Sequence, residues 1–262
     1  MENQKNDNLN LLEAVVQNTE MGKNALEQIV PMTEEPRFKA ELLRQRNIYR
    51  ELNQEARTAI TACGGAGIPT VKPWDNATVA RKIALARSSG CFAMAMDIDA
   101  AGLPFLQGLT PPAGSKSVEE LKQIVSWAQR PFILKGIMTA RGAEKALEAG
   151  ASGIVVSNHG GRVLDHCPAT AEVLPEIVDA VGGKLTILVD GAIRSGMDMF
   201  KALALGADAV LIGRPFVTTV YGGGEEGVQL YVQKLKAELA DTMRMCGAHS
   251  LADIDRSMLY GF

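Results

Sequence analysis

The chain of 262 residues has little of what several classes of protein need. It has only 4 cysteines and no CxxC pair, which argues against a disulfide framework or a zinc site. The net charge of -3 gives no basic excess, so we expect no nucleic-acid partner. No apolar run approaches the roughly 18 residues of a membrane span, and the polar N-terminus lacks a signal peptide's apolar core. These absences predict a cytoplasmic protein with reduced thiols and no membrane contact.

The first sixty residues differ in pattern from the rest of the chain. Apolar side chains recur at helical spacing over residues 9–30 and 38–60, and two prolines, Pro31 and Pro36, interrupt the pattern between them. Two helices joined by a short link predict a helical hairpin, to which we assign no function. The glycine-rich segment 63–67 is the best candidate boundary, so the predicted domains are residues 1–63 and 64–262.

After this boundary, short apolar runs alternate with helical patterns. Predicted strands begin near residues 68, 92, 131, 153, 185 and 209. Predicted helices cover about 76–88, 117–128, 139–149, 170–181, 196–205 and 224–246. One of them starts with a capping box formed by Ser117 and Glu120. This alternation predicts an α/β fold with parallel strands, and the unbroken apolar runs predict strands that are buried on both faces.

Polar residues stand where these strands end. The residues at this position are Asp97, Lys135, His159, Asp190 and Arg214. In a (β/α) barrel, the carboxyl ends of the strands form the catalytic face. We therefore expect these side chains to converge on one site.

The segment 157–162, Ser-Asn-His-Gly-Gly-Arg, is the strongest candidate for chemistry. His159 can accept a proton near neutral pH, and Arg162 can hold a carboxylate with two hydrogen bonds. The two glycines allow a sharp turn close to a flat ligand. Taken alone, the segment fits a solvated turn with a structural histidine equally well, and its neighbours along the chain favour the site.

Two glycine-arginine segments follow the last two strands, at residues 190–196 and 213–215. This is the usual position of the phosphate site in (β/α) barrels. Backbone N–H groups at a glycine turn and at a helix N-terminus bind anions, and arginine adds charge. The pair predicts a phosphorylated cofactor or substrate.

These motifs together resemble the FMN-dependent α-hydroxy acid oxidases and dehydrogenases, a family that includes glycolate oxidase and lactate oxidase. The resemblance rests on Lys135-Gly136, on 157–162 followed by Leu164-Asp165, on 190–194 and on 213–215, and it runs through residues 68–262. It implies a TIM-type barrel that binds FMN and oxidises a small 2-hydroxy acid to the 2-keto acid. It also implies a homo-oligomer.

The resemblance further implies roles for individual residues and no metal. His159 matches the base, Arg162 the ligand of the substrate carboxylate, and Asp97 the acid that orients the histidine. Lys135 matches the cation near N1 and O2 of the flavin, and Ser157 a flavin-contacting hydroxyl. The ribityl and phosphate contacts match Asp190, Gly191, Arg194, Gly213 and Arg214.

The chain departs from the family pattern in three places. It has about six βα units instead of eight, so we expect an incomplete barrel. No arginine occurs in residues 97–102, where many members carry a second substrate clamp, and Ala192 stands where glycine is common. An FMN- or phosphate-binding barrel remnant without turnover, acting as a binding or interaction module, is therefore the alternative. A barrel isomerase that uses reduced FMN is a third reading, which the segment 157–162 disfavours.

Overall fold

The computed structural model describes residues 26–27, 29–63, 67–103, 106 and 110–261. The chain divides into two compact units, residues 1–67 with 216–229 and residues 68–215 with 230–262. The division of the chain at residues 63–64 stays a prediction, and no pattern in the sequence indicated that residues 216–229 group with the N-terminal segment.

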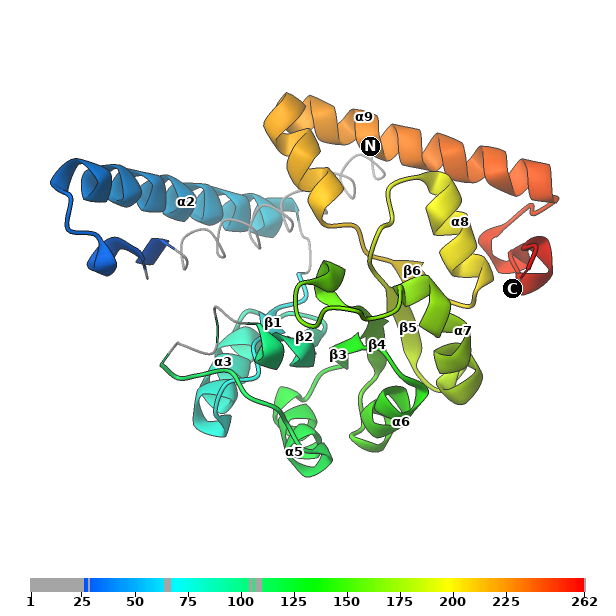
Figure 1. Cartoon of the computed structure of the whole chain (residues 1–262), viewed down its shortest axis with the longest axis horizontal. Helices are drawn as coiled ribbons and strands as arrows, with labels where there is room; N and C mark the ends of the chain where they lie inside the picture. The colour runs from blue at the N-terminus through cyan, green and yellow to red at the C-terminus, as the bar shows by residue number, and fades with distance from the viewer. Residues whose placement is uncertain (1–25, 28, 64–66, 104–105, 107–109, 262) are drawn as a thin grey trace. The chain divides into compact units, whose positions relative to one another are not determined.

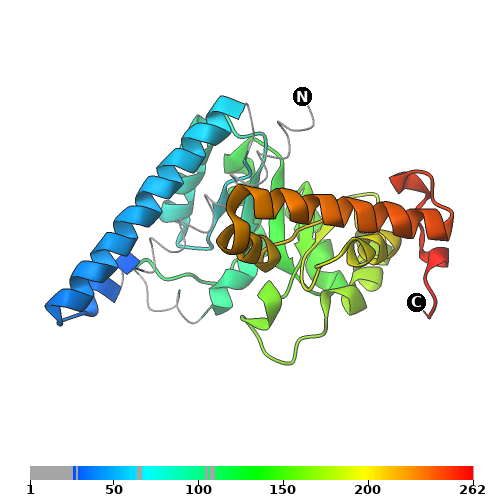
Figure 2. The same ribbon diagram turned by 90° about the horizontal axis from the view of Figure 1, so that it is seen from above.

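The first unit contains one long helix, α2 (Pro36–Cys63), which Figure 2 shows as a continuous rod. It corresponds to the predicted helix 38–60. Most of the predicted helix 9–30 lies outside the described residues. The part that is described contributes Leu26 and Val30, which are buried together with Leu42 of α2.

The second unit is built on a six-stranded sheet in which every strand runs parallel to its neighbours. The strands are β1 (Thr70–Val71), β2 (Met94–Asp97), β3 (Phe132–Ile137), β4 (Gly153–Val156), β5 (Thr186–Val189) and β6 (Ala209–Val210). They follow one another in chain order across the sheet, as in a (β/α) barrel. The six predicted strands are therefore confirmed.

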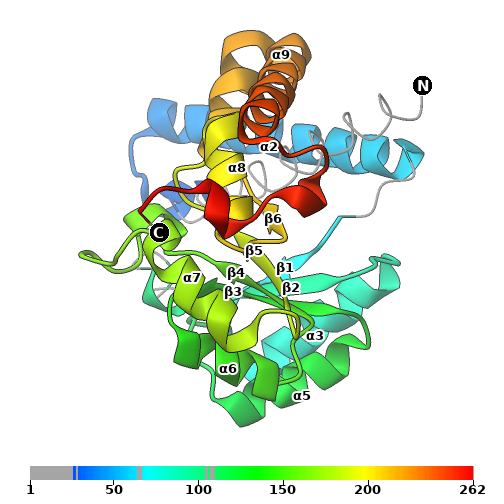
Figure 3. The same cartoon turned by 90° about the vertical axis from the view of Figure 1, so that its right-hand side faces the viewer.

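Helices connect successive strands. They are α3 (Asn76–Ser88), α5 (Val118–Ala128), α6 (Ala140–Glu148), α7 (Thr170–Val181) and α8 (Gly196–Ala204). Figures 1 and 3 show α3, α5, α6 and α7 along one face of the sheet. The predicted capping box starts α5, because the Glu120 N–H donates to Ser117 Oγ at 3.2 Å and the Ser117 N–H donates to Glu120 Oε2 at 2.8 Å.

The last helix, α9 (Arg214–Cys246), begins ten residues earlier than the sequence predicted. Its backbone leaves the helical region at Gly223 and Gly224, so the predicted start at residue 224 marks this interruption. The preceding segment is helical from Arg214, with Pro215 in the first turn, where a missing N–H costs nothing. The start of α9 therefore lies directly after the end of the sheet.

The burial on both faces that the unbroken apolar runs predicted is found in β2 and β4, whereas the other strands carry partly or fully exposed residues. All four residues of β2 and all four of β4 are buried. Within the described part of the chain, β1 pairs only with β2 and β6 only with β5, so the sheet does not close. This open sheet confirms an incomplete barrel. None of the described helices is long and apolar enough to span a membrane.

Candidate active site at the strand ends

The turn after β4 is held in shape by Asn158. Its side-chain oxygen accepts the backbone N–H groups of Gly160 and Gly161 at 3.1 and 3.3 Å. Both glycines have a positive φ, and so does His159, at 56°. A positive φ is uncommon for a residue other than glycine, and it is found where the surrounding structure compensates for the strain.

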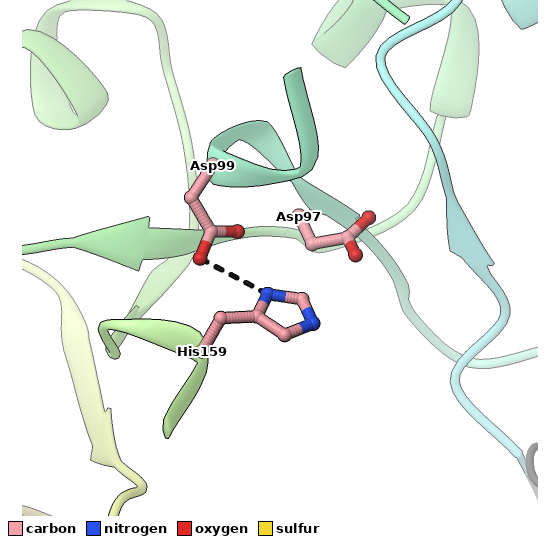
Figure 4. A group of neighbouring side chains, drawn as sticks. All are labelled: Asp97, Asp99 and His159. Atoms are coloured by element: carbon pink, nitrogen blue, oxygen red, sulfur yellow. Dashed lines mark hydrogen bonds and ion pairs between the residues drawn. The ribbon is translucent and has the colours of Figure 1, made fainter. Parts of the chain in front are cut away.

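The His159 imidazole is bound by a carboxylate, although not by the one that the sequence predicted. Asp99 Oδ2 lies 3.0 Å from His159 Nδ1, and these side chains are only 11% and 15% exposed. Figure 4 shows this bond, with Asp97 outside it. The prediction that Asp97 orients the histidine is therefore wrong, because Asp99 and not Asp97 makes the hydrogen bond to the imidazole. β2 continues through Asp97, whereas Asp99 lies in the 3-10 turn η1 (Ile98–Gly102), which redirects the chain toward His159.

Asp97 is paired with a residue that the sequence analysis did not select, Lys72. The Lys72 ammonium forms a hydrogen-bonded ion pair with Asp97 Oδ2. Burial raises the pKa of the Asp97 carboxyl, and Lys72 offsets part of this rise by its charge and its hydrogen bond. Lys72 directly follows β1, so the rule that selected the other strand-end residues would have found it.

A second polar group joins the ends of β3, β4 and β5. Lys135 Nζ donates to Ser157 Oγ at 2.5 Å and lies 2.8 Å from Asp190 Oδ2. The Ser157 oxygen also accepts the backbone N–H of His159 at 3.2 Å. The structure thus brings together three of the residues that the sequence assigned to one site, and Ser157 connects them to the histidine turn.

Three buried carboxylate oxygens at these strand ends have no hydrogen-bond partner among the described residues: Oδ1 of Asp97, Asp99 and Asp190. A buried acceptor without a donor is costly, so these atoms are candidates to accept hydrogen bonds from a ligand. Ligand atoms of Asp97, Asp99 and His159 lie within 4.8 Å of one another, a spacing that also suits a metal ion. Because the Lys72 cation already faces Asp97, we assign no metal to this cluster.

Two of the three arginines of the predicted site, Arg162 and Arg214, lie close to the histidine turn. Arg162 Nε donates to the His159 carbonyl at 3.3 Å, within the turn. An added Cβ at Gly160 would lie 2.6 Å from Arg214 Nη2. A side chain at position 160 would therefore require the Arg214 guanidinium to shift, and this contact shows that the Arg214 side chain at the start of α9 lies beside the histidine turn.

The N-terminus of α8 differs from what the sequence predicted. Asp198 Oδ2 accepts the N–H groups of Arg194 and Ser195 at 3.1 and 3.0 Å, and Glu238 accepts the N–H of Gly196 at 2.9 Å. These donors are already occupied by the chain's own carboxylates. The phosphate contacts that the sequence predicted at Arg194, Gly213 and Arg214 stay predictions.

The turn that leads from β5 to Arg194 is tight. Gly191 has φ 100°, and Ala192 has φ 58°, in the left-handed region that disfavours a side chain. Thr170 Oγ1 donates to the Asp190 carbonyl at 2.7 Å and fixes the start of the turn. The departure noted in the sequence, alanine in place of glycine, thus falls at a strained position.

Comparison with known proteins identifies the family. The sequence pattern of the FMN-dependent dehydrogenases matches residues 13–261. The chain belongs to this family. The match includes most of the N-terminal segment, so the similarity extends beyond the residues 68–262 on which the sequence resemblance rested.

Three relatives illustrate the range of the family. A peroxisomal (S)-2-hydroxy-acid oxidase of Oryza sativa subsp. japonica is 48% identical over 149 residues, covering 57% of this chain and 40% of that protein. An L-lactate oxidase of Nostoc sp. is 46% identical, covering 60% of this chain and 42% of that protein. The crystal structure of mandelate oxidase has a TM-score of 0.68 at 33% identity, covering 75% and 64% of the two chains. The chain thus spans about two fifths of the length of the curated relatives it matches.

The residues at the strand ends fit the cofactor of this family. Lys135 supplies a cation, Ser157 a hydroxyl, and Asp190 an unpartnered buried oxygen that can accept a bond from a ribityl hydroxyl. An added Cβ at Gly213 would meet no atom within 4 Å, so the backbone before α9 is open to a phosphate. These groups together are therefore suited to binding FMN.

Proposed function

We propose that this protein is an FMN-dependent oxidoreductase that oxidises a small 2-hydroxy acid to the 2-keto acid. The observation that carries the proposal is the largely buried His159–Asp99 pair, one turn from Arg162 and connected through Ser157 to Lys135. The arrangement supports a base, an anion-binding arginine and a cation at the ends of neighbouring strands. The family relationship and the hydroxy-acid oxidase relatives support the same assignment.

The histidine is arranged to accept a proton. With the Nδ1 proton donated to Asp99, Nε2 is the free basic nitrogen of the ring, as a general base requires. Once Nε2 takes a proton from substrate, the Asp99 carboxylate stabilises the resulting imidazolium. Arg162 is the proposed ligand of the substrate carboxylate, because its guanidinium can form the two-pronged bond such a group favours.

The cofactor would be held by the chain's own charges and hydroxyls. FMN, when bound, accepts the two electrons released in the oxidation. Lys135 would provide positive charge beside the flavin ring, and Ser157 a hydrogen bond. Asp190 and Gly191 would contact the ribityl chain, and Arg194, Gly213 and Arg214 the phosphate.

The alternative is an FMN-binding barrel remnant without turnover, and the open sheet is the observation that favours it. The purified chain, incubated with FMN and washed, separates the two. The proposed enzyme binds flavin, and its absorbance near 450 nm bleaches when glycolate, lactate or mandelate is added without oxygen. Flavin that binds but stays oxidised with all three acids, in the parent and in His159→Gln alike, would establish the remnant; no uptake of flavin would refute both.

Two further assignments belong to the proposal. A homo-oligomer is proposed because no further strand among the described residues pairs with β1 or β6, and a second subunit can cover such edges. Light scattering on the purified chain tests this, and a monomer at micromolar concentration contradicts it. A cytoplasmic location is likewise proposed, whereas the rice relative is named peroxisomal; imaging of the tagged protein in its own cells decides it.

A further inference from the structure

The proposed reaction leaves two charged residues of the described strand ends, Lys72 and Asp97, without a role. The Lys72 ammonium is paired with Asp97, and the lysine side chain is 27% exposed against 4% for the aspartate. Asp97 in turn lies within 4.8 Å of the ligand atoms of Asp99 and His159. Two carboxylates therefore face one imidazole, and the lysine holds the second of them.

Two carboxylates beside a histidine would impair a base. Each negative charge favours the protonated imidazole, and a histidine that already carries a proton cannot accept one from substrate. Asp99 is needed to orient the ring, because it makes the direct bond to Nδ1. Asp97 makes no such bond, and its charge needs a cation other than His159.

We propose that Lys72 is a positioning residue that supplies this cation: by pairing with Asp97 it offsets the second negative charge beside His159, the proposed base. The inference rests on the proposed function for its catalytic meaning, although the charge relation itself can be measured without turnover. Loss of Lys72 leaves the buried Asp97 carboxylate without the cation that it bonds, so its charge acts on the nearby imidazole and we expect His159 to take up a proton at higher pH.

Other charges around His159 do not explain the same effect. The charged groups close to the histidine turn are Asp99 in η1, Asp97 in β2, Lys72 after β1, Arg162 in the turn, Arg214 at the start of α9 and Lys135 in β3. Among those whose contacts are known, Lys135 is engaged with Ser157 and Asp190. Lys72 is the residue whose ion pair includes the second carboxylate.

The test is a titration of the histidines by NMR on the full chain with FMN added. The sequence has only 3 histidines, so the His159 ring signal is assigned by its loss in His159→Gln. In Lys72→Met the pH midpoint of the His159 titration rises by about one pH unit, whereas in Lys72→Arg it stays at the parent value. In Asp97→Asn the midpoint falls, and in the double variant Lys72→Met/Asp97→Asn it returns toward the parent value, because both members of the pair are gone.

A matched control is Lys122→Met on α5, which removes an equally charged side chain from ion pairs with Glu119 of the same helix and Glu148 of α6. It leaves the midpoint unchanged. An unchanged or lowered midpoint in Lys72→Met overturns the inference, and so does a double variant that behaves like Lys72→Met. If Lys72→Met fails to fold, Asp97→Asn decides alone, since no fall in its midpoint refutes the coupling.

Activity provides the second readout. In Lys72→Met the acidic limb of the plot of kcat/KM against pH shifts to higher pH, together with the NMR midpoint. If Lys72 had a purely structural role, its loss would lower the rate equally at every pH. A chain without turnover, which would refute the proposed function, still gives the NMR result. The two failures are therefore distinguishable.

Discussion

Replacing Ala192 by glycine should stabilise the protein. The left-handed φ of 58° costs alanine about 1–2 kcal/mol, and glycine avoids this cost. Glycine loses more chain entropy on folding, by about 0.5–1 kcal/mol. Because Ala192 is exposed, little packing is lost with its methyl group. The net gain in the free energy of unfolding is therefore about 0.5–1 kcal/mol.

Urea denaturation of the full chain measures this gain directly, and thermal unfolding should show a rise of about 1–4 °C. Ala237→Gly is the matched control, since Ala237 is exposed and lies inside α9. There the same substitution should cost about 1 kcal/mol, because glycine weakens a helix interior. A loss of stability in Ala192→Gly, or changes of the same sign in both variants, would refute the reasoning from backbone strain.

Three further predictions concern the site. Asp99→Asn should lower kcat/KM by about 10²- to 10⁴-fold in stopped-flow flavin reduction, because His159 loses the charge that orients it and stabilises its protonated form; a rate within threefold of the parent would contradict this. Gly160→Ala should weaken FMN binding about tenfold in a fluorescence titration, since its Cβ would lie 2.6 Å from Arg214 Nη2. Gly161→Ala is the control, because it shares the positive φ but has open space, and equal losses in both would exclude the clash. Asp198→Asn should cost about 1 kcal/mol in urea unfolding at neutral pH. Burial alone would raise the pKa of Asp198, but hydrogen bonds from Ser195 and Arg194 outweigh it and lower the pKa, so its contribution is fully present above its unfolded pKa and fades as pH falls through the lowered folded value. A difference from the parent that persists undiminished at the most acidic pH would contradict this.

The order of elements could be read from the sequence because its signals are local. Buried strands need unbroken apolar runs, and helix starts such as Ser117–Glu120 are satisfied by residues three positions apart. The polar residues that end the strands could be found for the same reason, since parallel strands in a barrel all end on one face.

The partners within the site could not be read in this way. Asp97 and Asp99 are two residues apart and chemically identical, so only the end of β2 and the turn η1 decide which of them bonds His159. Glu238 accepts a hydrogen bond from the backbone N–H of Gly196 at the start of α8. These residues are far apart in sequence, so no local pattern predicts the contact.

The sequence by itself thus determined the strand order, the histidine turn and the open sheet, because burial and turn chemistry act between near neighbours. Only the tertiary structure decided which carboxylate orients His159 and that Lys72 holds the other. Both are contacts between different strand ends, and their geometry follows from how the chain folds around the sheet.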